Sequence, residues 1–249
     1  MRFFRSCLAV FCFGLFGLGG IVVGMILFPI FTFFVRKEKK QRVLSATVRS
    51  SWIFFVKVMT FLRLIKVEVK GKTDFKHIKG HIIVANHPTL IDVILLVSLI
   101  PNCICVVKNK LANNFFIKHI IRGVYLVNNE KAEDFLKKGS DLLANDMNIV
   151  IFPEGTRTTD FLKPPEKLYR GFAQLAVRSK APVLPVRIDC NPLILGKNQK
   201  WYDVDKKTVL YTFLFLSPVK ADTKATESFH HQSKELSEKI KEKLFKRTY

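Results

Sequence analysis

The stretch IIVANHPTLIDVILL, residues 82–96, places a histidine and an aspartate inside an otherwise apolar run. Its opening residues are typical of a buried strand. Pro88 suits the first turn of a helix, where its missing N–H does no harm. The sequence therefore predicts a strand, a corner at Asn86 and His87, and then a helix over residues 88–98.

Short apolar runs continue to alternate with helix-like stretches after residue 67, a pattern that is typical of an α/β domain. The predicted strands are 81–85, 103–107, 124–127, 148–152, 183–188 and 209–216. The predicted helices are 88–98, 130–145, 170–179 and the amphipathic segment 226–246. We therefore predict an α/β fold with a mixed, largely buried sheet flanked by helices, plus an N-terminal membrane-embedded helical segment.

The N-terminal region is apolar enough to enter a membrane. Residues 8–35 carry no charged side chain, and a bilayer-spanning helix needs only about 20 residues. The run is too long for a signal peptide, and no small-residue cleavage site follows it. Because the run contains several glycines and Pro29, one spanning helix and a helical hairpin are both compatible with the sequence. Basic residues are denser after this run, at 36–42, which places the following domain on the cytoplasmic side.

The next segment mixes basic residues with apolar ones such as Val48, Trp52 and Phe61. This pattern predicts a basic amphipathic helix, which lies along a membrane surface or packs on the domain. We therefore divide the chain into a membrane anchor at 1–40, a connecting helix at 41–70 and the α/β domain at 71–249.

The formal net charge is +21 and the sequence pI is about 9.9. Such an imbalance indicates a polyanionic partner, which is nucleic acid, anionic lipid or an acidic carrier. The basic stretches are not interleaved with aromatic residues in a nucleic-acid-binding motif. We therefore expect an anionic membrane surface as partner and no nucleic acid.

The five cysteines are odd in number, and none has the spacing of metal ligands. Cys103 and Cys105 alternate along a predicted strand, so they point to one face of it. We expect buried free thiols and no metal site.

His87 and Asp92 are a candidate acid–base pair. Five residues along a straight helix rotate a side chain by about 140°, but His87 precedes the predicted helix, so its ring can fold back toward Asp92. One ring nitrogen would then bond the carboxylate, and the other would be free to take a proton from a hydroxyl. Neither Ser nor Cys stands in a nucleophile-elbow context, so a substrate hydroxyl would attack directly. A buried, satisfied pair without a catalytic role fits the same residues equally well.

The second polar stretch is IVIFPEGTRT, residues 149–158. Gly155 allows the backbone to approach a ligand closely, and the planar fork of Arg157 suits a phosphate. Glu154 would orient Arg157 or accept a hydrogen bond from a ligand hydroxyl. Taken alone, the stretch also fits a charged turn at a strand end with a surface ion pair.

Together, NHPTLID and FPEGTRT resemble the paired NHxxxxD and FPEGTRS patterns of the 1-acylglycerol-3-phosphate acyltransferases, in the glycerolipid acyltransferase superfamily. Thr158 stands at the final Ser position. The stretch APVLPVRI, residues 181–188, is similar to a third block of that family. The resemblance covers residues 80–189 and implies a glycerolipid-acyltransferase-like fold for the domain at 71–249.

This resemblance implies a membrane-bound O-acyltransferase that moves a fatty acyl chain from acyl-CoA or acyl carrier protein to a lysophospholipid hydroxyl. The expected reaction converts 1-acylglycerol-3-phosphate to phosphatidic acid. His87 would be the general base and Asp92 its orienting partner. The substrate-binding residues that it implies are Glu154, Gly155, Thr156, Arg157, Lys108 and Pro185, of which Pro185 would shape the acyl-donor side.

The resemblance also implies no bound cofactor, with the acyl donor acting as co-substrate. The expected partners are a membrane lipid acceptor, the acyl carrier and an anionic membrane surface. We expect the protein in a membrane, the bacterial inner membrane, with the domain on its cytoplasmic side.

The stretch RGVYLVNNE, residues 122–130, departs from the family pattern, because Asn128 and Asn129 stand where an arginine for phosphate is expected. The phosphate of the acceptor therefore lacks one cationic contact, unless Lys108 or Arg122 takes the place of the missing arginine. This stretch, with residues 190–202, is similar to acyltransferases of specialised bacterial lipids such as aryl polyenes. The alternative outside enzymes is a non-catalytic membrane protein that binds anionic lipid.

Overall fold

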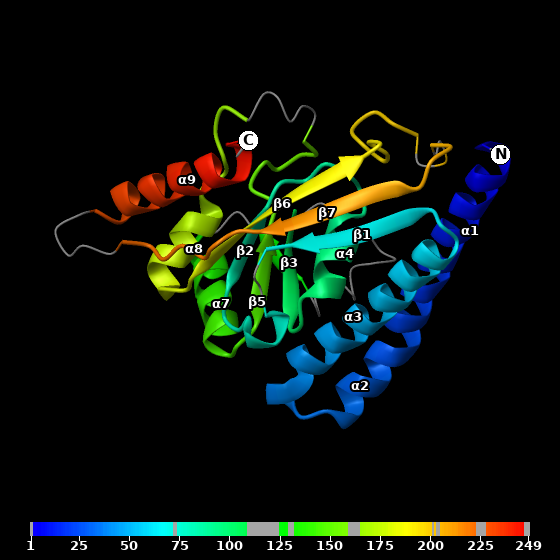
Figure 1. Ribbon diagram of the computed structural model, residues 1–249. Coiled ribbons are helices and arrows are strands. Elements are labelled where there is room, and N and C mark those ends of the chain that lie inside the picture. Colours follow the sequence, from blue (N-terminus) through cyan, green and yellow to red (C-terminus); the bar gives the residue numbers. More distant parts are fainter. Residues whose placement is uncertain are drawn as a thin grey trace.

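The computed structural model describes residues 2–71, 74–108, 125–128, 132–158, 165–200, 202, 205–222 and 228–246. Within these residues a seven-stranded sheet has the order β1-β7-β6-β2-β5-β3-β4 (Figure 1). Neighbouring strands are parallel except for the antiparallel pair β6 and β7. The strands are β1 Ile65–Lys70, β2 Ile82–Ala85, β3 Cys103–Lys108, β4 Leu126–Asn128, β5 Asn148–Ile151, β6 Val183–Asn191 and β7 Val209–Phe215. The predicted mixed sheet is confirmed.

Helices cover both faces of this sheet (Figure 1). They are α1 Arg2–Ile21, a π-helical turn Val22–Leu27, α2 Phe28–Phe34, α3 Lys37–Phe61, a 3-10 turn Phe75–His77, α4 Asp92–Leu99, α7 Ala132–Ala144, α8 Gly171–Ser179 and α9 Phe229–Phe245. Side chains of α3 and α4 share one core with Ile83 and Ala85, whereas α7, α8 and α9 share the other with Ile82 and Val84. Because both faces are covered, β2 and β5 are buried along their whole length.

The N-terminal helical run Phe3–Phe34 is, among the described residues, long and apolar enough to cross a membrane. It continues through the π-helical turn, and the chain reverses only at Val35 and Arg36. The structure therefore differs from the hairpin alternative within residues 1–40, because the second arm is α3. The Phe16 and Phe55 rings, 5.0 Å apart, join α1 to α3.

The predicted connecting helix at 41–70 is too long, because α3 ends at Phe61 and residues 65–70 form the edge strand β1. The sequence IKVEVK does carry the two-residue alternation of a strand with one exposed face. The basic residues beside this run made it resemble a continuation of the amphipathic helix.

Helix α3 packs against the domain along one stripe and exposes the opposite side. Val48, Trp52 and Phe55 are buried, whereas Phe54 is 59% and Phe61 is 85% exposed. Packing on the domain is therefore observed, and large apolar side chains remain on the outer face of the same helix.

Cys103 and Cys105 are both buried in β3, as the alternation predicts. Burial raises the pKa of the Cys105 thiol to about 12. The five cysteines are free thiols, and the buried pair in β3 is unreactive because the thiolate is disfavoured there.

The amide of Asn86 extends the hydrogen bonding between β2 and β6. Its Nδ2 donates to the carbonyl of Ile188 at 2.8 Å, and its Oδ1 accepts from the Ile188 N–H at 2.7 Å. Asn86 is 1% exposed, so water does not replace these partners. The end of β2 is therefore held in one position immediately before His87.

The substitution Asn86→Ala removes both partners of the Ile188 backbone groups. We expect it to lower the free energy of unfolding by about 2–4 kcal/mol, since each unsatisfied buried group costs about 1–3 kcal/mol. Denaturant unfolding in detergent measures this loss. The control is Asn145→Ala, whose exposed amide bonds only the Asp141 carbonyl; equal effects of the two substitutions would contradict the role of Asn86.

Candidate active site

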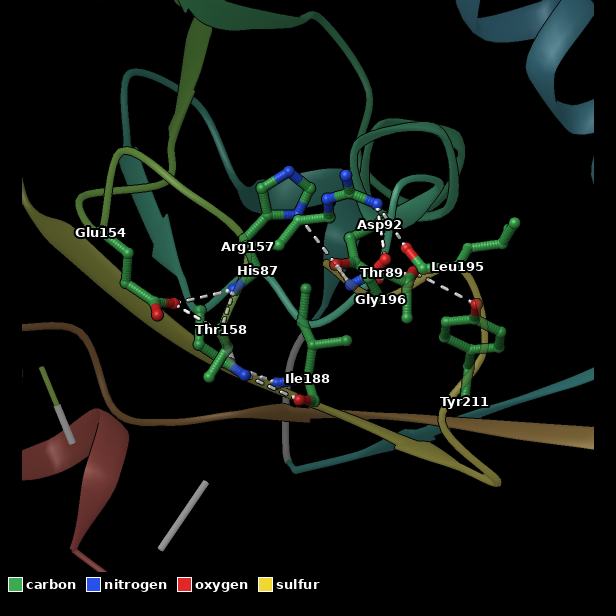
Figure 2. Close-up of polar contacts among 11 residues, drawn as sticks. His87, Thr89, Asp92, Glu154, Arg157, Thr158, Ile188, Leu195, Gly196 and Tyr211 are labelled. Carbon is green, nitrogen blue, oxygen red and sulfur yellow. Dashed lines mark hydrogen bonds and ion pairs between the residues drawn. The ribbon is translucent and has the colours of Figure 1, made fainter. Parts of the chain in front are cut away.

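His87 lies two residues after Ala85, the last residue of β2, and Asp92 is the first residue of α4. The predicted helix start at Pro88 is wrong, because residues 88–91 form a turn before the helix begins. That turn brings His87 Nδ1 to 2.9 Å from Asp92 Oδ2 (Figure 2). The two side chains thus meet as the sequence predicts, and their catalytic roles stay a prediction.

Asp92 is fully buried, and both of its carboxylate oxygens are hydrogen-bonded. Oδ1 accepts from the Thr89 hydroxyl at 2.5 Å, and Oδ2 accepts from the Thr89 N–H at 2.6 Å. The Tyr211 hydroxyl in β7 contacts the Thr89 hydroxyl at 3.2 Å. Burial raises the pKa of Asp92, and the hydrogen bonds from His87 and Thr89 oppose that rise. These contacts leave the carboxylate a single orientation.

The orientation of Asp92 decides which nitrogen of His87 is available. Asp92 is the acceptor in its contacts with Thr89, so the ring donates to it at Nδ1, and in the neutral imidazole Nε2 then carries the lone pair. Phe152 stacks on the ring with centroids 4.4 Å apart, and the His87 side chain is 22% exposed. Within the described residues Nε2 has no hydrogen-bond partner. The arrangement can accept a proton from a hydroxyl that approaches Nε2.

The stretch FPEGTRT holds the backbone of His87. Glu154 Oε1 and Thr158 Oγ1 each lie 3.0 Å from the His87 N–H, and the Thr158 N–H donates to the His87 carbonyl at 2.7 Å. The Thr158 hydroxyl also donates to Glu154 Oε1 at 2.7 Å. Glu154 was expected to orient Arg157 or bind a ligand hydroxyl; its half-buried carboxylate is hydrogen-bonded through Oε1 to the His87 N–H and the Thr158 hydroxyl.

Gly155 occupies a position that only glycine fits. Its φ is +65°, and a Cβ atom there would lie 2.5 Å from the ring of Tyr169. The Tyr169 N–H donates to the Pro153 carbonyl at 2.8 Å, which holds the Tyr169 backbone beside the loop that carries the glycine. Thr156, the next residue, is exposed. The positive φ therefore favours glycine at this position, and the Tyr169 ring adds a close contact within the protein itself.

Arg157 was expected to bind a phosphate, but one of its amino groups already has backbone partners. Nη1 donates to the carbonyls of Leu195 at 2.8 Å and Gly196 at 2.9 Å (Figure 2). Nε and Nη2 have no hydrogen-bond partner within the residues that the structure describes. Three N–H donors therefore remain for a ligand.

The other predicted binding residues are less directly placed. Pro185 is buried in β6, pairs with Val84, and accepts a hydrogen bond at its carbonyl from the Leu216 N–H. The side chain of Lys108, at the end of β3, lies outside the described residues, as does Arg122. Pro185 is therefore part of the sheet, and its partner in β2, Val84, lies three residues before His87.

Sequence reasoning missed Thr89, Phe152 and Tyr211. The spacing of Thr89 and Asp92 follows the capping-box pattern, with Asp in the place of Glu, and was a usable signal. Tyr211 had no such signal, because it reaches Thr89 only through the pairing of β7 with β6.

The substitution Gly155→Ala combines an unfavourable φ with a steric clash. We expect a loss of about 1–2 kcal/mol of stability from the backbone conformation, and a further loss from the contact with Tyr169. In a Tyr169→Ala background only the backbone part should remain. Unfolding of the single and double variants measures both parts, with Gly14→Ala as control because nothing lies within 4 Å of its Cβ position. Equal losses in both backgrounds would contradict the clash.

The Glu154 carboxyl gives a pH-dependent prediction. Burial raises the pKa of Glu154, so folding favours its protonated form. Its contribution to stability is complete below the pKa of the unfolded carboxyl and is lost as the pH rises through the higher folded pKa. Glu154→Gln is neutral throughout and keeps an acceptor oxygen. We expect the unfolding free energy of the variant, relative to the parent, to increase from about pH 4 to 8.

Denaturant unfolding of both proteins at several pH values measures this difference. The control Glu166→Gln replaces an exposed carboxylate and should show no such trend. A difference between Glu154→Gln and the parent that stays constant with pH would contradict the effect of burial.

Known proteins resemble this chain in sequence. Residues 66–189 match the family described as Acyltransferase. The 1-acyl-sn-glycerol-3-phosphate acyltransferase alpha of Mus musculus is 28% identical over 133 residues, which are 51% of this chain and 46% of that protein. The 1-acyl-sn-glycerol-3-phosphate acyltransferase of Helicobacter pylori is 31% identical over 143 residues, 55% of this chain and 56% of that protein. The chain therefore spans about half the length of the curated relatives it matches.

A solved structure shows the same fold. The crystal structure of the 1-acyl-sn-glycerophosphate (LPA) acyltransferase PlsC from Thermotoga maritima has a TM-score of 0.67, at 20% identity, and covers 100% of both chains. At this identity the likeness concerns the arrangement of the sheet and its helices.

Proposed function

Because the chain belongs to the acyltransferase family that includes the 1-acyl-sn-glycerol-3-phosphate acyltransferases, we propose that it transfers a fatty acyl chain to a lysophospholipid hydroxyl. The donor is a thioester, either acyl-CoA or the acylated form of acyl carrier protein. The observation that carries this proposal is the His87 ring, oriented by the buried Asp92 with Nε2 facing away from it.

The dyad suits direct attack by the acceptor. Nε2 of His87 takes the proton of the acceptor hydroxyl as its oxygen bonds to the thioester carbonyl carbon. Asp92 stabilises the imidazolium that forms. When the tetrahedral intermediate collapses, the carbon–sulfur bond breaks and His87 returns the proton to the leaving thiolate. A general base of this kind contributes about 10²–10⁴-fold to the rate.

The acceptor in this proposal is 1-acylglycerol-3-phosphate, and the product is phosphatidic acid. The activity in the names of the relatives supports it, as do the donors that remain on Arg157 and the net charge of +21. Lys108 or Arg122 would supply a second cation for the phosphate. Transfer to a phosphate-free hydroxyl is the second candidate, favoured by Asn128 and Asn129 where the family pattern has an arginine.

The proposed location is a membrane. The apolar run Phe3–Phe34 and exposed side chains such as Phe33 and Phe61 suit a lipid environment. Basic residues at 36–42 follow that run, so the domain would lie on the cytoplasmic side of a bacterial inner membrane. A soluble acyl donor would reach the site from that side.

The substitution His87→Ala tests the proposal. We expect the rate of acyl transfer to fall by at least about 10²-fold, because the general base is lost. Purified protein in detergent is assayed with both donor types against lysolipids with and without a phosphate. The control His77→Ala removes an exposed ring that bonds Asp74 and should retain full activity.

Each outcome of this assay has a defined meaning. Transfer to phosphate-bearing acceptors that is lost in His87→Ala supports the proposal, and transfer only to phosphate-free acceptors favours the specialised-lipid alternative. Equal rates in both His variants would refute the role of His87. A parent protein that binds anionic vesicles but transfers no acyl group from either donor would favour the non-catalytic alternative.

A further inference from the structure

The chain that follows β6 is buried where it passes the site. Ile194 is 8% and Leu195 is 5% exposed, and Gly196 is also buried. Irregular backbone with this degree of burial needs hydrogen-bond partners for its N–H and carbonyl groups, because water does not reach them. The groups that supply these partners therefore show what holds the segment 192–199 in place.

Both motif stretches supply such partners. The Leu195 carbonyl accepts from Arg157 Nη1 at 2.8 Å and from the Leu90 N–H at 3.1 Å. Leu90 lies in the turn between His87 and Asp92. The Gly196 carbonyl accepts from Arg157 Nη1 at 2.9 Å. The Leu195 carbonyl therefore joins Arg157, from the second motif stretch, to the turn that follows His87.

A third contact closes the segment on itself. The Gly196 N–H donates to Gln199 Oε1 at 2.8 Å, and the Gln199 N–H donates to the Gly196 carbonyl at 3.2 Å. The Gln199 side chain is uncharged, and it stabilises the segment by accepting the hydrogen bond from the Gly196 N–H. It therefore provides a neutral substitution site that affects the same backbone.

The segment also lines an apolar cavity beside the site. Ile194 and Leu195 face this cavity together with Ile91, which precedes Asp92, and with Cys12 and Phe55 of α1 and α3. A shift of residues 194–195 would therefore change the cavity wall and the turn before Asp92 at the same time.

The shape of arginine suits two tasks at once. Its planar group has five N–H donors in a fixed geometry, and Nη1 uses its two on neighbouring carbonyls. Nε and Nη2, which have no partner in the described part of the chain, point their hydrogens elsewhere. Lysine keeps the positive charge but lacks the planar fork.

We propose that Arg157 is a positioning residue whose Nη1 holds residues 195–196 against the His87 turn, whether or not an anion occupies its other donors. This role sets the apolar wall beside His87. Its effect on catalysis rests on the proposed acyl transfer, whereas its effect on the order of segment 192–199 does not.

Hydrogen exchange without substrate tests the structural part. We expect amides of residues 192–199 to exchange about tenfold faster in Arg157→Gln, since charge-assisted hydrogen bonds are lost. Arg157→Lys should also exchange faster, because charge alone does not replace the fork. The control Arg178→Gln removes a surface pair with Glu133 and should leave this segment unchanged. Parent-like exchange in both Arg157 variants would overturn the proposal.

Kinetics test the catalytic part. If Arg157 positions the segment, Arg157→Lys and the uncharged Gln199→Leu both lower kcat, by about tenfold, because the reacting groups lose their alignment. If Arg157 serves only as a phosphate clamp, Arg157→Lys raises KM for the phosphate acceptor and Gln199→Leu behaves as the parent, which overturns the catalytic role. A parent without acyl transfer refutes the proposed function instead, and the exchange result then still decides the structural role.

Discussion

The hydrogen bonds between the His87 backbone and the stretch from Glu154 to Thr158 are the contact on which the site depends. The His87 N–H faces two acceptors and its carbonyl faces the Thr158 N–H. These bonds join the end of β2 to the loop after β5, two strands that pair in parallel. With Asn86 bonded to β6 on the other side, the histidine is fixed from both neighbouring strands. Its ring is then oriented by the hydrogen bond to Asp92 and by stacking on Phe152.

A buried carboxylate, Asp92, and a half-buried one, Glu154, accompany this arrangement, and each has a distinct physical task. Asp92 contacts the imidazole, and its remaining hydrogen-bonding capacity is taken up by Thr89. Among the described residues, Glu154 Oε1 is hydrogen-bonded to the His87 N–H and to the Thr158 hydroxyl, which hold the backbone of the turn. Burial raises the pKa of both groups, and local N–H and O–H donors offset part of the desolvation cost. The site thus holds two carboxyl groups within a chain of basic composition, and the proposed phosphate-bearing acceptor would need cationic groups beside them.

The relation between the N-terminal helices and the domain follows from the same core. Arg5 at the start of α1 donates to the carbonyls of Arg63, Asp205 and Lys207, which lie at the β1 and β7 edge of the sheet. Helix α3 returns alongside α1 and leads directly into β1 (Figure 1). The apolar segment is therefore packed on the α/β domain, and the cavity beside the site is lined by both.

The sequence by itself determined the α/β class, the strands of the central sheet and the meeting of His87 with Asp92. Those features depend on local periodicity and on a five-residue spacing, which a short turn can satisfy. Only the tertiary structure decided what Glu154, Arg157 and Tyr211 contact, and that residues 65–70 form a strand. Such contacts join segments far apart along the chain, and their geometry depends on strand register and on burial, which no single stretch encodes. Arg157 shows the difference most clearly, because its residue type suits a phosphate while the fold gives one of its nitrogens two buried carbonyls.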